Sequence, residues 1–194
     1  MAGDFYDFLA LTEGRWGFVI ADVSDKGIPA AIFMAVARSS IRASVLGRRP
    51  PAEALARANA LLLNDTRADM FVTLCYCILE PTTGALTYVN AGHTPPLVYR
   101  AATNTTEYLE SRGIVLGAVD GIELEERQAI LNLGDVLVLY TDGVTEAIDA
   151  QEEDFGETRL AETVHLHHTQ NAADIIEADD WLIDHEPPIR YETL

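Results

Sequence analysis

Two aspartates flank a segment with the pattern of a β-hairpin. Residues 4–22, DFYDFLALTEGRWGFVIAD, hold two apolar runs on either side of the turn signal Thr12–Gly14. If Glu13 lies at the centre of the turn, Asp4 stands directly opposite Asp22. Opposed side chains lie about 5 Å apart, and like charges there are destabilising. A hard cation such as Mg²⁺ or Mn²⁺ would relieve the repulsion, because it prefers carboxylate oxygen; frayed strand ends with solvated carboxylates are the alternative.

A third aspartate follows another apolar run. Asp142 comes directly after DVLVLYT at 135–141, and it precedes a glycine. Three aspartates that lie close together could hold two metal ions about 3.5–4 Å apart. A water activated between such ions can hydrolyse a phosphate ester. Asp22 is the best candidate for a bridging ligand, because it is paired with Asp4 and begins a turn. For Asp142 a purely turn-forming role is the alternative, since Asp-Gly favours turns.

The composition limits the partners that the chain can bind. Its 194 residues carry 13 basic and 31 acidic side chains, which gives a net charge of −18. Such a surface repels nucleic acid and anionic membranes, and it is compatible with cation binding. No signal peptide or transmembrane run is visible in the sequence, so we expect a cytoplasmic protein.

Periodicity and turn signals predict an α+β fold, a β-sandwich of two antiparallel sheets flanked by helices. Cys75 and Cys77 alternate in one predicted strand, so we expect both on one buried face as free thiols. The predicted helices are Pro29–Leu46, Pro51–Leu63 and Glu157–His167. The predicted strands after the first hairpin are Met70–Leu79, Ala85–Ala91, Leu97–Tyr99 and a hairpin of Glu123–Leu131 with Asp135–Thr141, whereas Thr103–Thr106 is predicted to be a loop.

Five ordered motifs carry a family resemblance that runs from Ala2 to about Leu160. The chain resembles the metal-dependent serine/threonine phosphatases (PPM) of bacteria. It is most similar to the branch that contains the sporulation stage II phosphatase and the stress-response sigma-factor regulators. The motifs are Ala2–Asp7, Asp22–Ala31, Met70–Leu74, Asn90–Pro96 and Tyr140–Ala147.

The resemblance implies a two-metal site and a protein substrate. Asp4 and Asp22 would bind one ion together with the Val23 main-chain carbonyl, and Asp22 and Asp142 would contribute to the other. The ions would be Mn²⁺ or Mg²⁺, and these aspartates would be the catalytic residues. The substrate would be phosphoserine or phosphothreonine on a small regulatory protein of the anti-sigma-factor antagonist type. A sensor domain would precede this domain in the full-length protein.

The C-terminal part departs from the family pattern. Family members end with an Asp-Asp pair followed by an apolar strand, whereas here Asp179 and Asp180 come early and Pro187-Pro188 would stop a strand. Either Asp180 is a displaced metal ligand or the segment continues a helix from Ala172. We therefore expect one phosphatase domain over 1–194, excised from a longer protein, with an atypical tail over 161–194. An incomplete metal site would instead make the chain a phosphatase-like binding module or pseudoenzyme.

Other polar residues have a structural interpretation beside a functional one. Asp25 stands where related sequences often carry glycine, and it either initiates a turn or holds a peripheral ion. His93 is either catalytic or a structural part of the bend in its motif. The histidines His165 and His168 share a predicted helical face, and a solvated helix end explains them without a metal. No serine lies in a G-x-S-x-G context, which disfavours a serine hydrolase.

Overall fold

The structure is a computed structural model that describes residues 3–47, 49–65, 70–148 and 153–177. The chain divides into two compact units. Unit 1 comprises residues 1–95 and 110–130, and unit 2 comprises residues 96–109 and 131–194. Each unit has its own antiparallel sheet with flanking helices, so the predicted fold class is confirmed.

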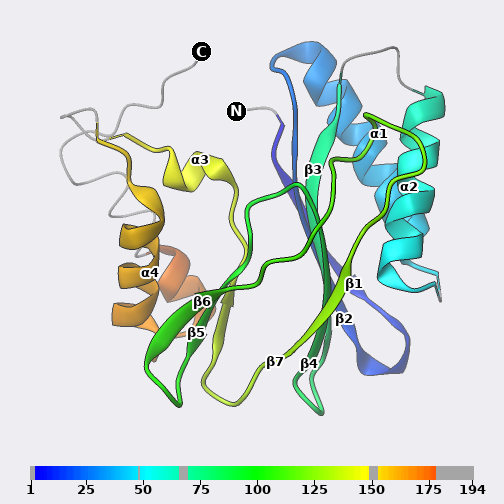
Figure 1. Ribbon diagram of the computed structural model, residues 1–194. Helices are drawn as coiled ribbons and strands as arrows, with labels where there is room; N and C mark the ends of the chain where they lie inside the picture. The colour runs from blue at the N-terminus through cyan, green and yellow to red at the C-terminus, as the bar shows by residue number, and fades with distance from the viewer. Residues whose placement is uncertain (1–2, 48, 66–69, 149–152, 178–194) are drawn as a thin grey trace. The chain divides into compact units, whose positions relative to one another are not determined.

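Unit 1 is built on a five-stranded antiparallel sheet with the strand order β1-β2-β3-β4-β7 (Figure 1). Consecutive strands are neighbours except at the last position, where β7 joins from a later part of the chain. The strands are β1 Phe5–Ala10, β2 Trp16–Val23, β3 Val72–Glu80, β4 Ala85–Ala91 and β7 Glu126–Ile130.

The β1–β2 hairpin has the register that the sequence predicts. Phe5 pairs with Ala21 and Ala10 pairs with Trp16. A short 3-10 turn, η1 Thr12–Gly14, joins the strands, and its central residue Glu13 adopts a positive φ of 64°. This turn fixes which residues face one another, because a slip of one position would move every side chain to the opposite face of the sheet.

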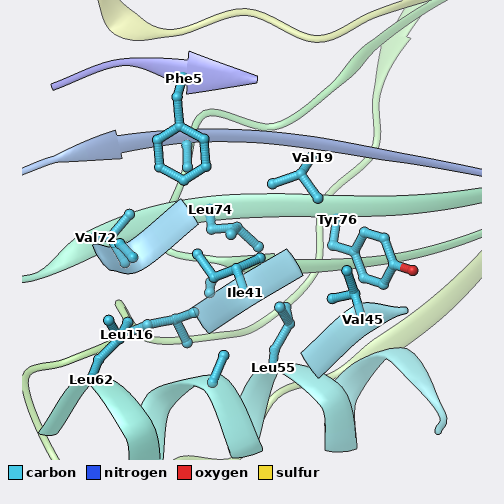
Figure 2. Close-up of a cluster of buried hydrophobic side chains, with 14 of the residues drawn as sticks. Phe5, Val19, Ile41, Val45, Leu55, Leu62, Val72, Leu74, Tyr76 and Leu116 are labelled. Carbon is cyan, nitrogen blue, oxygen red and sulfur yellow. The ribbon is translucent and has the colours of Figure 1, made fainter. Parts of the chain in front are cut away.

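Two helices cover one face of this sheet. They are α1 Ile28–Val45 and α2 Pro51–Asp65, close to the predicted bounds. The buried residues of α1 recur every three or four positions and are Ala30, Phe33, Ala37, Ile41, Ser44 and Val45, as expected for a helix that faces a core. Figure 2 shows Leu55 and Leu62 of α2 together with Ile41 of α1 in the cluster that includes Leu74 and Tyr76 of β3.

Helix α1 is long and apolar enough to cross a membrane, judged by length and composition alone. Its buried side lies in the core of unit 1, but only 33% of the helix is buried, and Ile28, Ile32 and Val36 are exposed. The two cysteines of β3 are also in place as predicted, since Cys75 and Cys77 are both buried free thiols.

Unit 2 contains a three-stranded antiparallel sheet with the order β6-β5-β8. The strands are β5 Leu97–Arg100, β6 Thr105–Tyr108 and β8 Val136–Val138. Two helices follow, the single turn α3 Asp142–Thr145 and the longer α4 Gly156–His167. The core of this unit combines both element types and contains Leu97, Tyr99, Tyr140, Ala147, Phe155, Leu160 and Val164.

The hairpin predicted between residues 123–131 and 135–141 is wrong. Strand β7 pairs with β4 in unit 1, whereas β8 pairs with β5 in unit 2. The turn signal itself is real, because the Asp135 N–H donates to the Asn132 carbonyl at 3.0 Å. Local turn chemistry therefore holds, but each strand finds a partner in a different sheet. The loop predicted over 103–106 is also corrected in part, since Thr105 and Thr106 belong to β6.

Candidate metal centre

The end of the β1–β2 hairpin places Asp4 opposite Asp22. The ladder continues one step beyond β1, because the Val23 N–H donates to the Gly3 carbonyl at 3.3 Å. With Phe5 paired to Ala21, this contact leaves Asp4 and Asp22 as the facing pair. Asp4 is exposed and Asp22 is half-buried. The two aspartates thus occupy facing positions at an accessible edge of unit 1.

Gly3 shows how closely the oxygen atoms of this edge converge. A Cβ placed on Gly3 would lie 2.7 Å from Asp22 Oδ1 and 2.8 Å from the Val23 carbonyl oxygen, closer than real Cβ contacts. Only glycine leaves room for both oxygens. Carboxylate and carbonyl oxygens are the ligands that Mg²⁺ and related hard cations take, so the residues present fit an ion of this class.

Asp7 lies outside this oxygen cluster. Side chains alternate across a strand, so Asp7 faces away from Asp4 and toward the helices. Its carboxylate accepts from Arg42 at 2.5 Å and lies 3.6 Å from the Arg38 guanidinium, and the Asp7 side chain is only 11% exposed. Asp7 therefore connects β1 to α1 rather than contributing to a cation site.

Asp25 has the geometry of a turn residue. Its φ is 80°, and its carboxylate accepts the N–H of Lys26 at 2.8 Å. Aspartate tolerates this left-handed region better than most residues because its short side chain can bond the local backbone. These contacts favour the turn-forming interpretation of Asp25.

Asp142 begins α3 in unit 2. It is exposed, and its main-chain carbonyl accepts from the Glu146 N–H at 2.7 Å and from the Thr145 hydroxyl at 3.2 Å. These contacts involve its backbone and leave the metal role of its carboxylate a prediction. Asp180 lies outside the described residues, and a role for it as a ligand stays a prediction as well.

Other groups that could bind a metal or act as nucleophiles do not form a competing site in the described part of the chain. No cluster of three or more His, Cys, Asp or Glu suited to a metal is found among those residues, and this holds for the predicted set Asp4, Asp22 and Asp142 as well. A hydrogen bond with Cys77 and burial raise the pKa of the Cys75 thiol well above its usual value, so it is a poor nucleophile. His165 and His168 pack on Tyr99, with ring centroids 5.7 and 4.4 Å away, and are therefore not simply a solvated helix end.

Two residues that the sequence did not single out contact the motif residues Asp22 and His93. Thr73 pairs with Asp22 in the β2–β3 register, and its hydroxyl contacts both the Asp22 carbonyl and the His93 ring. Asn90 holds the main chain of His93. The motifs that contain Thr73 and Asn90 were visible in the sequence, but the contact of Thr73 with Asp22 depends on the pairing of distant segments.

Comparison with known proteins places the chain in a family. The sequence model for "Stage II sporulation protein E (SpoIIE)" matches residues 12–179. The phosphoserine phosphatase RsbU of Bacillus subtilis is 34% identical over 146 residues, which span 75% of this chain and 43% of RsbU. The phosphoserine phosphatase RsbP of the same organism is 25% identical over 150 residues, spanning 75% of this chain and 37% of RsbP.

A solved structure agrees with the sequence comparisons. The RsbU and RsbW domains of Rv1364c from Mycobacterium tuberculosis match with a TM-score of 0.82 and 27% identity, over 97% of this chain and 52% of that one. The chain spans less than half the length of the two curated relatives named above. With the family match covering most of its residues, this chain belongs to the stage II sporulation protein E family and carries a PPM-type serine/threonine phosphatase domain.

Proposed function

We propose that this domain hydrolyses phosphoserine or phosphothreonine on a regulatory protein in a reaction that depends on Mn²⁺ or Mg²⁺. The observation that carries the proposal is the convergence of the Asp22 carboxylate and the Val23 carbonyl on Gly3, beside Asp4. Membership of the family and the relatives named phosphoserine phosphatases support it.

The proposed ligands divide between two ions. Asp4, Asp22 and the Val23 carbonyl would hold the first, and Asp22 with Asp142 would hold the second. Bound ions of this kind lower the pKa of a coordinated water and offset charge on the phosphoryl oxygens. Asp22 can serve both ions because a carboxylate has two oxygen atoms. Asp180 is the candidate for the last carboxylate.

The proposed partner is a phosphorylated protein of the anti-sigma-factor antagonist type. The relatives RsbU and RsbP are phosphoserine phosphatases, and the family resemblance points to sigma-factor control. The net charge of −18 disfavours nucleic acid and anionic membranes as partners. We further propose a cytoplasmic location and a sensor domain upstream in the full-length protein.

A second candidate is a binding module or pseudoenzyme that recognises the same partner without efficient turnover. The residues from Asp179 onward favour it, because their sequence departs from the final strand motif of the family. In this case the domain would bind one ion weakly and turn over phosphate esters slowly.

Substitution of the aspartates separates the two candidates. Calorimetric titration with Mn²⁺ and hydrolysis of a phosphoserine peptide would be measured for wild type and for Asp22→Asn, Asp4→Asn and Asp142→Asn. We expect Asp22→Asn to be the most damaging, with a loss of about 10²–10³ in rate, the range seen when one transition-state-stabilising group is removed. Asp4→Asn and Asp142→Asn should each weaken one ion.

Two further variants complete the experiment. Asp120→Asn makes the same chemical change at an exposed loop residue and should leave metal binding and turnover unchanged. Asp180→Asn tests the last ligand: a loss equal to that of Asp142→Asn assigns Asp180 to the site, and a silent result assigns slow turnover to an incomplete ligand set. The enzymatic proposal is wrong if wild type binds no divalent ion at millimolar concentration, or if Asp22→Asn retains full metal-dependent turnover.

A further inference from the structure

The bend that contains His93 is anchored by a buried side chain of β4. Asn90 is 5% exposed. Its carboxamide Nδ2 donates to the His93 carbonyl at 2.9 Å, and its Oδ1 accepts the His93 N–H at 2.7 Å. Both ends of the amide are therefore used on one residue, so the backbone of His93 is held in a single position relative to the sheet.

The His93 ring in turn contacts the strand next to the metal hairpin. Its Nδ1 lies 2.9 Å from the hydroxyl oxygen of Thr73. Thr73 stands directly opposite Asp22 in the β2–β3 ladder, and its Oγ1 lies 3.4 Å from the Asp22 carbonyl oxygen, a long contact for a hydroxyl donor. A threonine hydroxyl has one proton, so if it is donated to Asp22, the His93 Nδ1 must carry the proton that completes the chain.

This series of hydrogen bonds ends at the Asp22 carbonyl, and the planarity of the peptide group links that carbonyl to two proposed metal ligands. The Asp22 carbonyl belongs to the planar unit that also contains the α-carbons of Asp22 and Val23. One of these α-carbons carries the ligand carboxylate, and the other carries the ligand carbonyl. A hydrogen bond to the Asp22 carbonyl restricts the orientation of this plane and thereby the directions from which the two oxygens can approach an ion.

We infer that Thr73 and His93 are positioning residues that orient the Asp22–Val23 peptide for metal binding. The inference rests on the proposed function, because it assigns these residues to the same metal site. Substitution of a group that orients a metal ligand commonly lowers the affinity for the metal by about tenfold or more. Neither Thr73 nor His93 would touch the ion or the substrate.

The test compares variants of Thr73 by Mn²⁺ affinity. Thr73→Val removes the hydroxyl and keeps the shape of the side chain, whereas Thr73→Ser keeps the hydroxyl and removes a methyl group. We expect about tenfold weaker Mn²⁺ binding for Thr73→Val and a change within about twofold for Thr73→Ser, in line with the loss of one orienting hydrogen bond. Thr87→Val, the same exchange on the half-buried Thr87 of β4, is the control and should bind Mn²⁺ like wild type.

A second measurement uses the metal-free wild-type protein, so it does not depend on metal binding or on the correct folding of a variant. Long-range ¹H–¹⁵N spectra of the metal-free wild-type protein at a pH where His93 is neutral should show the Nδ1–H tautomer, and a predominant Nε2–H tautomer would overturn the inference. So would equal Mn²⁺ affinity of wild type and Thr73→Val, or a loss in Thr73→Ser as large as in Thr73→Val. These results would leave the proposed function intact, whereas a wild-type protein that binds no Mn²⁺ would overturn both.

Discussion

At the scale of single residues, Gly27 links the metal hairpin to the first helix. It precedes α1 with a φ of 84° and a ψ of −160°, a backbone region that is essentially confined to glycine. Its carbonyl accepts the N–H of Ala31 at 3.1 Å and so begins the helix. The loop before it begins directly after Val23, the end of β2, so the conformation of Gly27 helps to set the direction in which the chain leaves the proposed site.

We therefore expect Gly27→Ala to lower the free energy of unfolding by about 1–3 kcal/mol, the usual cost of a strained backbone conformation. Urea denaturation followed by circular dichroism would measure it. Gly47→Ala is the control, because a Cβ on Gly47 meets nothing closer than the Ser44 carbonyl at 3.7 Å. Equal stability of Gly27→Ala and wild type would show that the loop adapts without strain.

At the scale of elements, ion pairs connect segments that are distant in the sequence. In unit 1, Asp7 connects β1 to two arginines of α1. In unit 2, Arg100 at the end of β5 binds both Glu107 of β6 and Asp135, which precedes β8. Each ion pair favours one alignment of two neighbouring elements. Hydrophobic burial alone specifies that alignment less closely, because it has no preferred direction.

The Asp7 contact yields a prediction about α1. Asp7→Asn removes the negative charge that pairs with Arg38 and Arg42 from a largely buried side chain. Because both arginines are already half-exposed and solvent screens their charges, we expect a loss of only about 1 kcal/mol in the free energy of unfolding. Urea denaturation is again the measurement. Glu13→Gln alters an exposed pair with Arg15 at 3.9 Å and should change stability little. A loss no larger than that of Glu13→Gln would contradict the role of Asp7 as a connection to α1.

The Asp135 contact yields a prediction about pH. Burial acts to raise the pKa of Asp135, but the hydrogen bond from Arg100 and the N–H groups of Asn132 and Ala101 outweigh it and lower the pKa below its usual value. A lowered carboxyl pKa contributes stability that is full above the pKa of the unfolded chain, about 3.9, and that is lost as the pH falls through the folded value.

Wild type should accordingly exceed Asp135→Asn in stability at pH 7 by about 1.5–3 kcal/mol, the range for hydrogen bonds to a charged group. The difference should shrink as the pH falls below about 4, because Asp135 of the unfolded chain takes up its proton there, whereas Asp135 of the folded protein does so only at lower pH. Urea midpoints for both proteins between pH 7 and pH 3 provide the measurement. A difference that stays constant over that range would mean that the charge of Asp135 is not what stabilises the β5–β8 connection.

At the scale of the whole molecule, the net charge of −18 opposes the compact state through self-repulsion. Added salt screens this repulsion, so any salt should stabilise the fold to some extent. A divalent ion held by the proposed ligands would add a separate, site-specific term, because a ligand that binds only the folded state stabilises it by mass action.

Mn²⁺ should therefore raise the melting temperature beyond the effect of NaCl at the same ionic strength. At a concentration 100 times the dissociation constant the added stability should be about 2.7 kcal/mol. Thermal unfolding of wild type and Asp22→Asn in both salts would measure it, and only wild type should show the difference. An identical response of the two proteins would mean that Mn²⁺ acts only as a screening ion.

The sequence alone determined the features that depend on neighbouring residues. The turn around Glu13 set the hairpin register and thereby the Asp4–Asp22 pair, because adjacent strands joined by a short turn have few other alignments. The periodicity and the prolines that open the helices placed α1 and α2. The sequence motifs also identified the protein family and the type of phosphatase domain.

Only the tertiary structure decided which distant segments meet. Strands β7 and β8 follow one another in the chain, yet they join different sheets, because each pairs where an open edge and a buried face are available. The pairing of Asp7 with α1, and of Thr73 with both Asp22 and His93, likewise joins residues 20 or more positions apart. A local sequence pattern does not predict such contacts, because their energy depends on how segments that are distant in the sequence pack together.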